Sequence, residues 1–513
     1  MKSSRVENSI RNTIYALSTQ IFSMLMSFAV RTVFIYTLGK DYLGFNGLFN
    51  NIFSILSLTE LGMGIAIVYS MYKPVAQEDH RKIAALLNLY RTFYRLVGFI
   101  VAALGLSLLP FLNYLVSGIR DIPELEIIYL LYLSSSVISY FFVYKKSILI
   151  VYQQDYISSR INLIINSIQG IIQIAILILW HNYILYLIIL ILAVFFDNML
   201  NSLYVDYKYQ YLKEYRSERV DKETKQKIYT DVKALFVSKI SSAIVTSTDN
   251  LLISAFISTI ILGLYSNYMM LINVVNVITS RILDSLTGSV GNLIAVESIE
   301  RVYLIFKRVW FINYWLVAFS SMSFFILANP FITLWVGKSY LLSSGIIFMV
   351  ALNLFMRLIR NTFIMFNNAF GHFVELKKKN IIEPIINIAA SLLFILVFKM
   401  GIIGVLLGTF ISNITTNFWF EPYLIFKKCQ VSLKEYFKIV GNYLLTSIVA
   451  GGLTYILCNI CLTGNNWVLF LIRIVICCIV INLTIILFYR KTDEYQYFMM
   501  LVKKVLKLSR GRR

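Results

Sequence analysis

The chain has 513 residues, of which 58% are hydrophobic and only 14% are charged, and its mean hydropathy is +0.74. This much apolar surface excludes an ordinary soluble domain and indicates a membrane protein. The formal net charge is +21, an excess that is found in nucleic-acid-binding proteins as well as at membrane surfaces, so the positions of the positive charges decide between these partners.

Apolar runs long enough to cross a hydrocarbon core of about 30 Å follow one another along the whole chain. We predict fourteen transmembrane helices, at residues 10–38, 42–72, 88–116, 124–151, 158–180, 183–210, 230–257, 259–286, 303–329, 341–369, 378–398, 402–426, 438–461 and 466–489. The first apolar run is followed by no small-residue cleavage site, so the first helix is expected to stay in the protein.

Positive side chains alternate between the two ends of these helices. With the N-terminus inside, the cytoplasmic segments and adjoining helix ends hold 41 lysines and arginines, whereas the outer ones hold four. This bias is the positive-inside pattern of membrane proteins. It predicts that both termini are cytoplasmic, that the number of membrane passes is even, and that the basic loops face anionic lipid headgroups rather than nucleic acid.

The first two predicted helices carry the most distinctive motif of the chain. Residues 36–64 have the pattern YxLGxxxLGxNGLFxNIxSxLSLxELGxG, in which a Gly-Lys-Asp-Tyr corner separates two apolar segments. The motif resembles the opening helix pair of bacterial polysaccharide flippases of the O-antigen and teichoic acid type. These flippases belong to the multidrug/oligosaccharidyl-lipid/polysaccharide exporter superfamily. Residues 248–275 and 383–409 resemble later helices of the same family, so the resemblance covers most of the chain up to about Lys428.

The longest charged interruption, residues 213–227, follows the sixth predicted helix. We therefore predict an all-α polytopic membrane fold with two six-helix lobes around a central cavity. The dipeptides Leu43-Gly44 and Leu262-Gly263, after the first and seventh helices, indicate that the lobes are repeats. The predicted parts are an N-terminal lobe at 1–212, a cytoplasmic linker at 213–228, a C-terminal lobe at 229–428, two additional transmembrane helices at 429–490, and a basic amphipathic cytoplasmic tail at 491–513.

Three charges within the predicted helices are candidates for substrate binding, namely Arg31, Glu60 and Arg281. A charge inside a transmembrane helix costs about 2.5 to 3.5 kcal/mol on insertion scales, so it marks a polar cavity unless it finds another partner. Each has a structural alternative. The stem of Arg31 can snorkel outward, Arg281 can pair with Asp284 one turn further on, and Glu60 can accept a structural hydrogen bond. The family resemblance implies that an arginine in the helix of Arg281 lines the cavity, as in lipid II flippases.

Two further acids, Asp249 and Asp197, are candidates for cation coupling. No basic residue lies within a turn of Asp249 in its own helix, so it either binds a cation or proton or is a carboxylate held by its neighbours. Asp197 has the same two interpretations. The resemblance implies a sodium site in the helix of Asp249, and sodium and protons both stay open as the coupling ion. Glu383 is interpreted as a helix-start carboxylate and Glu421 as an interfacial one.

No cofactor and no metal site are predicted. Cys458 and Cys461 have CxxC spacing, but they lie in an apolar helix without a second pair or a nearby histidine. The three histidines of the chain are scattered.

The tail is predicted to form an amphipathic helix on the inner leaflet. Phe498, Val502, Val505 and Leu508 recur at helical spacing, and basic residues occupy the other face.

Three functions compete for this sequence. A membrane-bound oligosaccharide polymerase or glycosyltransferase would need a large outer loop or a cytoplasmic catalytic domain, which the short loops do not provide. A cation-coupled multidrug exporter of the same superfamily would favour acids over arginines in its cavity. We therefore predict a non-enzymatic flippase that moves a polyprenyl-pyrophosphate-linked oligosaccharide repeat unit across the cell membrane by alternating access, for surface polysaccharide such as O-antigen, capsule or teichoic acid. Its expected partners are the lipid-linked substrate, membrane lipids, and the polymerase and glycosyltransferases of the same pathway.

Overall fold

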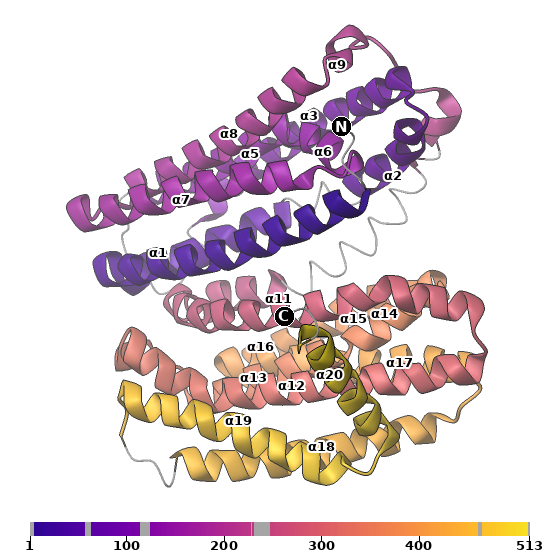
Figure 1. The fold of residues 1–513 in the computed structure, drawn as a ribbon. Helices are drawn as coiled ribbons and strands as arrows, with labels where there is room; N and C mark the ends of the chain where they lie inside the picture. Colours follow the sequence, from indigo (N-terminus) through magenta and orange to yellow (C-terminus); the bar gives the residue numbers. More distant parts are fainter. Residues whose placement is uncertain are drawn as a thin grey trace. The chain divides into compact units, whose positions relative to one another are not determined.

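The chain folds into long α-helices that are apolar enough to cross a membrane (Figure 1). A computed structural model describes residues 5–56, 63–112, 124–226, 228–229, 247–459 and 464–510. Within these residues the regular elements are α-helices, short 3-10 turns and two π-helical turns, with no β-strand. The predicted all-α polytopic membrane fold is thus confirmed.

Twelve helical segments of the described residues are long and apolar enough to span a membrane. They are Thr19–Asn50, His80–Phe111, Leu125–Val151, Asp155–Trp180, Tyr183–Lys208, Thr259–Ser280, Ile299–Trp335, Ser344–Phe370, Glu375–Val397, Gly401–Lys428, Leu433–Asn459 and Trp467–Tyr489. Thr19–Asn50 covers most of the first predicted helix and the start of the second, and each of the other eleven segments corresponds to one predicted helix. The other two, the second and the seventh, include residues 57–62 and 230–246, which lie outside the described part of the chain.

The chain divides into two compact units, residues 1–263 (unit 1) and 264–513 (unit 2). The helices of unit 1 are α1 (Arg5–Leu56), α2 (Met63–Ala76), α3 (His80–Leu108), α5 (Leu125–Phe142), α6 (Lys146–Val151), α7 (Asp155–Trp180), α8 (Tyr183–Lys208) and α9 (Tyr211–Glu214). In this unit α1 packs along α7, and α7 and α8 are neighbours joined by a short turn (Figure 1). The five predicted parts of the chain, from 1–212 to 491–513, stay predictions.

Helix α1 continues through the corner that was predicted between the first two transmembrane helices. Gly39 has φ 80° and ψ −165°, a conformation that side-chain-bearing residues rarely adopt. The two helical segments of α1 therefore meet at a kink, and glycine is needed at that point.

The two Leu-Gly dipeptides of the predicted repeat meet inside unit 1. A Cβ atom added to Gly44 would lie 2.4 Å from the carbonyl oxygen of Thr259, and one added to Gly263 would lie 2.7 Å from the amide nitrogen of Gly44. Leu43 and Leu262 beside these glycines are buried. Two backbones approach this closely only where side chains are absent, so both glycines are required by packing.

Unit 2 begins within α11 (Thr259–Val296). Its further helices are α12 (Ile299–Trp335), α13 (Ser344–Ile359), α14 (Asn361–Phe370), α15 (Phe373–Leu392), α16 (Gly401–Ser412), α17 (Phe418–Lys428), α18 (Leu433–Asn459), α19 (Trp467–Tyr489) and α20 (Asp493–Arg510). Helix α12 packs against α13, α14, α18, α19 and α20 and so forms the centre of this unit.

Aromatic rings from several helices form the core around α12. Tyr314 of α12 stacks on Tyr443 of α18 with ring centroids 3.8 Å apart, and Trp310 lies edge-on to Phe363 of α14 at 5.0 Å. The Tyr314 hydroxyl also donates to the Tyr443 carbonyl oxygen at 3.0 Å. Aromatic pairs of this kind contribute about 0.5 to 1.5 kcal/mol each beyond their burial, so the core ties α12, α14 and α18 together.

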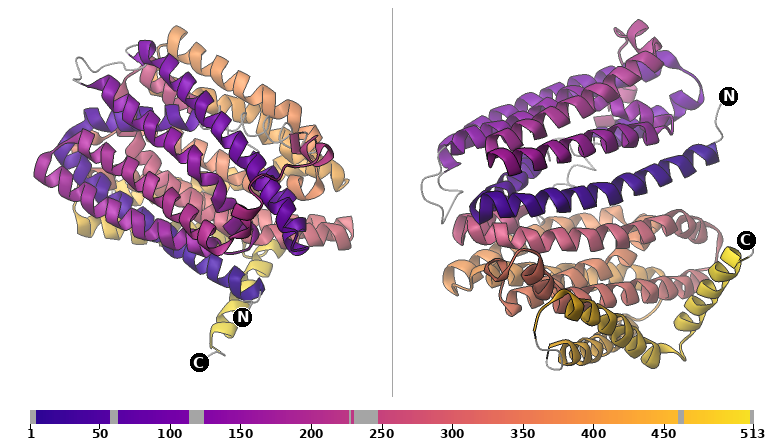
Figure 2. Two further views of the ribbon diagram at one scale, coloured as in Figure 1. Left: turned by 90° about the horizontal axis from the view of Figure 1, so that it is seen from above. Right: turned by 60° about the vertical axis from the view of Figure 1, so that its left-hand side comes forward.

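The predicted helix of the tail is confirmed as α20, and its first turns pack on α12. Trp315 of α12 contacts the ring of Phe498 at 5.1 Å, and the guanidinium of Arg308 lies 4.2 Å from the ring centre of Tyr497. Figure 2 shows that α20 departs from the direction of the long helices. These contacts give the start of the tail a protein partner, whereas its placement on the inner leaflet stays a prediction.

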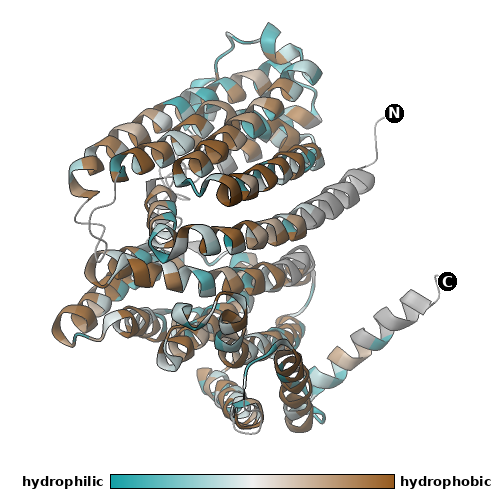
Figure 3. Ribbon diagram, turned by 90° about the vertical axis from the view of Figure 1, so that its left-hand side faces the viewer, coloured by the Kyte–Doolittle hydropathy of each residue, from teal (hydrophilic) through white to brown (hydrophobic). Residues whose placement is uncertain are grey.

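Large apolar side chains cover the outer surfaces of the long helices. Ile448, Val468 and Leu471 are exposed by 71%, 66% and 61%. Figure 3 shows that hydrophobic residues dominate the helices of both units and that hydrophilic residues gather in α9 and in the loops near it. A lipid environment accommodates such a surface without exposing it to water.

Candidate functional site

Arg31 lies among tyrosine rings of unit 1. The guanidinium, on α1, is close enough to Tyr132 of α5 and to Tyr183 and Tyr186 of α8 to interact with them electrostatically. The hydroxyls of Tyr132 and Tyr183 are 3.1 Å apart, and Phe34, one turn on from Arg31, packs edge-on against Tyr183 with ring centroids 5.6 Å apart. Phenol rings offer a cation both hydroxyl acceptors and π faces, so these surroundings suit a guanidinium held among helices.

Asp197, a predicted coupling acid, forms an ion pair in unit 1. Its Oδ2 accepts a hydrogen bond from the ammonium of Lys146 at 2.5 Å. Two turns further along α8, Asp206 pairs with Lys145 at 2.6 Å. The two carboxylates of α8 thus pair with adjacent lysines, Lys145 at the end of the 3-10 turn Val143–Lys145 and Lys146 at the start of α6. Asp197 therefore has a structural partner that any coupling ion would replace.

The other predicted residues are described only in part. Glu60 lies outside the described residues, and the side chain of Arg281 lies outside them as well, although its backbone is part of α11. Asp249 is partly buried in a helical stretch whose described part begins at the buried Ser247. The roles of Arg31, Glu60, Arg281, Asp249 and Asp197 stay proposals.

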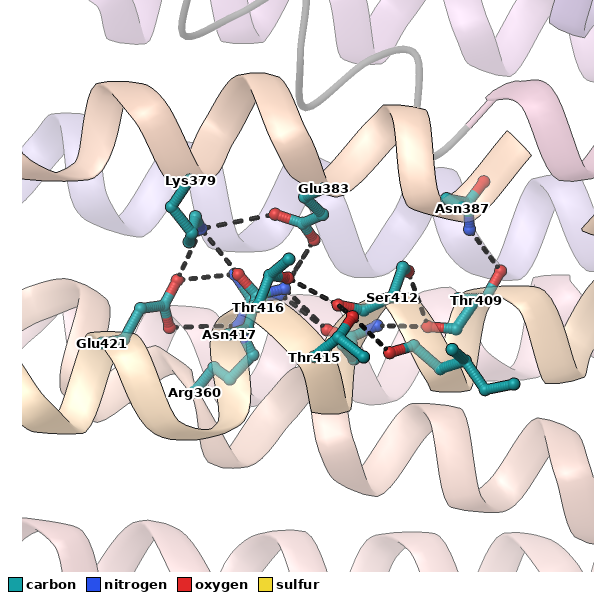
Figure 4. A network of polar contacts seen from close by, with 12 residues as sticks. Arg360, Lys379, Glu383, Asn387, Thr409, Ser412, Thr415, Thr416, Asn417 and Glu421 are labelled. Atoms are coloured by element: carbon teal, nitrogen blue, oxygen red, sulfur yellow. Dashed lines mark hydrogen bonds and ion pairs between the residues drawn. The ribbon is translucent and has the colours of Figure 1, made fainter. Parts of the chain in front are cut away.

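Unit 2 contains four buried charges that contact one another, which we call the buried ion network: Arg360, Lys379, Glu383 and Glu421 (Figure 4). Their side chains are exposed by 17%, 7%, 10% and 3%. Arg360 holds Glu421 with two parallel bonds, from Nε to Oε2 at 3.1 Å and from Nη2 to Oε1 at 2.7 Å. Lys379 Nζ lies 2.9 Å from Glu421 and 3.3 Å from Glu383. Two cations and two anions therefore neutralise each other in a buried site.

Amide side chains complete the hydrogen bonding of the buried ion network. Asn417 donates to Glu383 at 2.5 Å and accepts from Lys379 at 2.6 Å, and Asn413 accepts from Arg360 at 3.0 Å (Figure 4). Both asparagines lie on the π-helical turn Asn413–Asn417 between α16 and α17. A π-helical turn shifts the side chains that follow it around the helix axis, and such turns are frequent at functional sites. This turn presents Asn417 to the charges of α15 and Asn413 to Arg360, which lies between α13 and α14.

The network extends toward the short connection between α14 and α15. Asn367 of α14 donates to the carbonyl oxygen of Glu421 at 3.1 Å, and its Oδ1 lies 2.8 Å from Nδ1 of His372. Burial lowers the pKa of His372 below its ordinary value, and Lys428 adds to the lowering. Glu375 opposes this lowering.

A narrow pocket adjoins the network in unit 2. Arg360 and Asn417 form its polar wall, and Trp310, Phe363 and Tyr436 are among the rings that form the rest. One side of the pocket is therefore polar, and aromatic rings line much of the remainder.

Sequence reasoning missed this network. The interpretation of Glu383 as a helix-start carboxylate is wrong, because Glu383 lies in the interior of α15, buried and paired with cations. Glu421 was interpreted as interfacial, and its burial and its pairing with Arg360 and Lys379 were not predicted. Arg360 and Lys379 were counted only as positive charges of a cytoplasmic segment. The spacing of Lys379 and Glu383, four residues apart in one helix, was the available signal, since it places the two charges on one face.

The described residues contain no group of histidine, cysteine and carboxylate side chains that could hold a metal ion. Cys458 of the CxxC pair is buried, and its thiol lies 3.9 Å from the carbonyl oxygen of Arg473. Cys461 lies outside the described residues.

No protein-family model and no curated protein matches the chain. Its fold is similar to that of several solved transporters. The lipid II flippase MurJ in an inward closed conformation has a TM-score of 0.64 at 17% identity, over 94% of this chain and 99% of that one. An inward-facing multidrug resistance MATE family transporter of the MOP superfamily has a TM-score of 0.62 at 13% identity, over 81% of this chain and 98% of that one.

A third similar structure is a MOP superfamily transporter from Pyrococcus furiosus with a TM-score of 0.54 at 13% identity, over 84% of this chain and 98% of that one. It is described as having a binding pocket of reverse polarity that suggests a different function. The chain thus has the fold of MOP superfamily transporters, and these neighbours are transporters and a flippase rather than enzymes.

Proposed function

We propose that the chain is a flippase that moves a polyprenyl-pyrophosphate-linked oligosaccharide repeat unit across the cytoplasmic membrane, for surface polysaccharide biosynthesis. The extent of the fold match carries this proposal. The match to the lipid II flippase covers 94% of the chain, whereas those to MATE transporters cover 81% to 84%. Residues 429–513, which include α18, α19 and α20, make up about a sixth of the chain. The MATE matches leave a part of the chain of about the same size uncovered.

The charge of the proposed binding residues supports an anionic substrate. Arg31 and Arg281 offer permanently charged guanidinium groups, whose planar fork matches the oxygens of a pyrophosphate. The tyrosines around Arg31 suit the sugar as well, since their rings can stack on its apolar faces and their hydroxyls can bond to it. The Pyrococcus transporter has a similar fold and is described as having a binding pocket of reverse polarity. The substrate is therefore decided by the residues of the cavity rather than by the fold.

The mechanism that we propose is alternating access. The arginines hold the pyrophosphate, the sugar crosses in a wet cavity, and the lipid tail stays in the membrane. Asp249 is the proposed coupling residue for sodium or protons. Asp197 can take part only if a cation or proton displaces Lys146 from its carboxylate.

The proposal is tested by complementation of a flippase-deficient strain, with surface polysaccharide as the readout and membrane protein level followed by immunoblot. Arg281→Ala is expected to abolish export at normal protein level, and Arg281→Lys to retain part of it because lysine keeps the charge but loses the bidentate geometry. Arg31→Ala and Arg31→Lys should follow the same order. Arg301→Ala is the matched control, because Arg301 is an exposed arginine whose partner Glu297 lies four residues away. Full complementation by both alanine variants would mean that the phosphate is held elsewhere.

The multidrug exporter is the second candidate, because several neighbours with this fold are MATE transporters. The two candidates differ in the charge of what they move. Expression in an efflux-deficient strain should leave the inhibitory concentrations of cationic dyes unchanged if the chain is a flippase. A rise in these concentrations that disappears in Asp249→Asn, without complementation of polysaccharide export, would favour the exporter.

A further inference from the structure

A second cluster of arginines lies in unit 1 on one face of α3. Asn88, Arg91 and Arg95 are spaced by three and four residues, which places them on the same side of the helix. The side-chain amide of Asn88 donates to the carbonyl oxygen of Arg216 at 3.0 Å, and also to those of Tyr215 at 3.4 Å and of residue 218 at 3.1 Å. One asparagine thus fixes the segment after α9 on the face of α3 that carries the arginines.

The three guanidinium groups have one electrostatic partner in common. Arg91, Arg95 and Arg216 all lie close enough to Tyr144 to interact electrostatically with its hydroxyl. Tyr144 is buried in the 3-10 turn Val143–Lys145 that joins α5 to α6. Side chains from α3 and from the segment after α9 therefore act on one buried aromatic residue of a third element.

The positive charge of this cluster is not compensated. Asp206 is the acid that also acts on Tyr144, and it already pairs with Lys145 at 2.6 Å. In the described part of the chain, the guanidinium groups of Arg91, Arg95 and Arg216 form no ion pair and no hydrogen bond. Glu218 follows in the same segment without pairing to them. Three like charges are thus held together where their mutual repulsion favours an anion between them.

The position along α3 indicates which anion reaches the cluster. Arg95 directly precedes an apolar run that extends from Leu96 to Phe111, within the membrane-length segment His80–Phe111. The arginines therefore lie where the charged part of the helix meets its lipid-facing part. Lipid phosphate groups occupy this boundary, and arginine binds phosphate with two parallel bonds.

We propose that Arg91, Arg95 and Arg216 form a binding site for a phosphate group, which is supplied by the headgroup of an anionic lipid or by a soluble phosphate. The site shares no residue with the proposed substrate site and does not depend on what the protein transports. The phosphate binds where the charged part of α3 meets its apolar part, and the Asn88 contacts hold the segment of Arg216 in place there.

Native mass spectrometry of the purified full-length protein tests the site. Phosphatidylglycerol and phosphatidylcholine are titrated separately, and inorganic pyrophosphate is titrated in parallel with thermal unfolding as the readout. The wild type is expected to bind phosphatidylglycerol at least tenfold more tightly than phosphatidylcholine. The triple variant Arg91→Gln/Arg95→Gln/Arg216→Gln should lose this preference. The triple lysine variant should lose most of it, because the charge stays but the bidentate geometry does not.

Two controls separate a built site from diffuse attraction. Lys427→Gln/Lys428→Gln/Lys434→Gln removes the same charge from unit 2 and should leave the lipid preference unchanged. Asn88→Ala removes no charge and should weaken the preference severalfold, because it releases the segment that carries Arg216. Equal binding by the lysine variant and the wild type, or a preference that survives the glutamine variant, would overturn the site.

The pyrophosphate titration identifies the source of the phosphate. Stabilisation of the wild type by pyrophosphate but not of the glutamine variant, with equal binding of the two lipids, supports the site with a soluble phosphate as its ligand. If the wild type prefers neither phosphatidylglycerol nor pyrophosphate, the proposal is wrong.

Discussion

The two units bury their charges in different ways. In unit 2, Arg360, Lys379, Glu383 and Glu421 neutralise one another within one network, and amides of a π-helical turn complete their hydrogen bonds. In the described part of unit 1, Asp197 and Asp206 of α8 form separate two-residue ion pairs with Lys146 and Lys145, and Arg31 lies among tyrosine rings.

This difference predicts where each unit is vulnerable. A buried network of four charges is stable only while every charge keeps its partner, because the loss of one leaves an opposite charge uncompensated in a buried site. Separate pairs that reach the surface lose less, since water replaces the missing partner. Close packing of backbones occurs in both units, at Gly44 and Gly263 in unit 1 and at Gly408 in unit 2.

The largest effect is expected from Glu421→Gln. Glu421 is bound by both Arg360 and Lys379, so its neutralisation leaves two buried cations with Glu383 as their remaining counter-charge. Breaking a buried pair in this way costs roughly 3 to 5 kcal/mol. The free energy of unfolding of the purified protein in detergent, measured by denaturant titration, should fall by this amount.

A double substitution provides the control. Arg360→Leu with Glu421→Leu removes one cation and one anion and leaves the pair of Lys379 and Glu383, so it should restore much of the stability. A Glu421→Gln protein as stable as the wild type would show that the network is not what holds α15 and α17 together, and the contrast between the units would fail.

The next effect concerns the glycine contact of unit 1. Gly44→Ala places a methyl group 2.4 Å from the carbonyl oxygen of Thr259, which belongs to backbone and cannot rotate away. Overpacking of this kind costs about 1 to 3 kcal/mol. Gly441→Ala is the matched control, since nothing lies within 4 Å of a Cβ atom at Gly441. Thermal unfolding should show a lower midpoint for Gly44→Ala and an unchanged or higher one for Gly441→Ala, and equal midpoints would contradict the packing argument.

A smaller effect is expected at the ion pair of α8. Asp197→Asn leaves the side chain of Lys146 without its carboxylate, but that lysine is 23% exposed and can reach water. The stability should therefore fall by only about 1 kcal/mol. Transport with an unchanged dependence on sodium and pH would mark Asp197 as structural, whereas a changed dependence at normal protein level would support its proposed part in coupling.

The long helices were predictable because their apolar runs report membrane crossing directly, and the helix of the tail was predictable from the spacing of residues such as Phe498. From the sequence, the dipeptides of Gly44 and Gly263 were predicted only to be repeats, and the close approach of the two glycines was not predicted. The kink at Gly39 differs from the predicted corner because the helix resumes at once after a single positive φ.

The buried ion network was not predictable from local pattern. Arg360 and Glu421 are 61 residues apart in sequence, and Lys379 and Glu421 are 42 apart. Helical periodicity relates residues within a few turns and carries no information at these separations. The π-helical turn at Asn413–Asn417 adds a further shift, since it changes which side chains of α16 and α17 share a face.

The smallest effect is a pH dependence that should belong to unit 2. Burial lowers the pKa of His372, with a further lowering by Lys428 that Glu375 opposes. The unfolded pKa of histidine is about 6.5. Between the lowered folded pKa and this value, the unfolded protein binds more protons at this residue than the folded protein does. Stability should therefore fall as the pH drops from about 6.5 toward the lowered pKa, and it should not change further below that value for this group.

The His372→Gln variant tests this dependence. Its thermal midpoint should change less than that of the wild type between pH 7.5 and 5.5, because glutamine does not titrate and its side-chain amide can still donate to Asn367. The difference is expected to be small, since His372 is only partly buried. If the variant and the wild type lose stability equally, other groups account for the acid response, and the buried ion network is not linked to pH through Asn367.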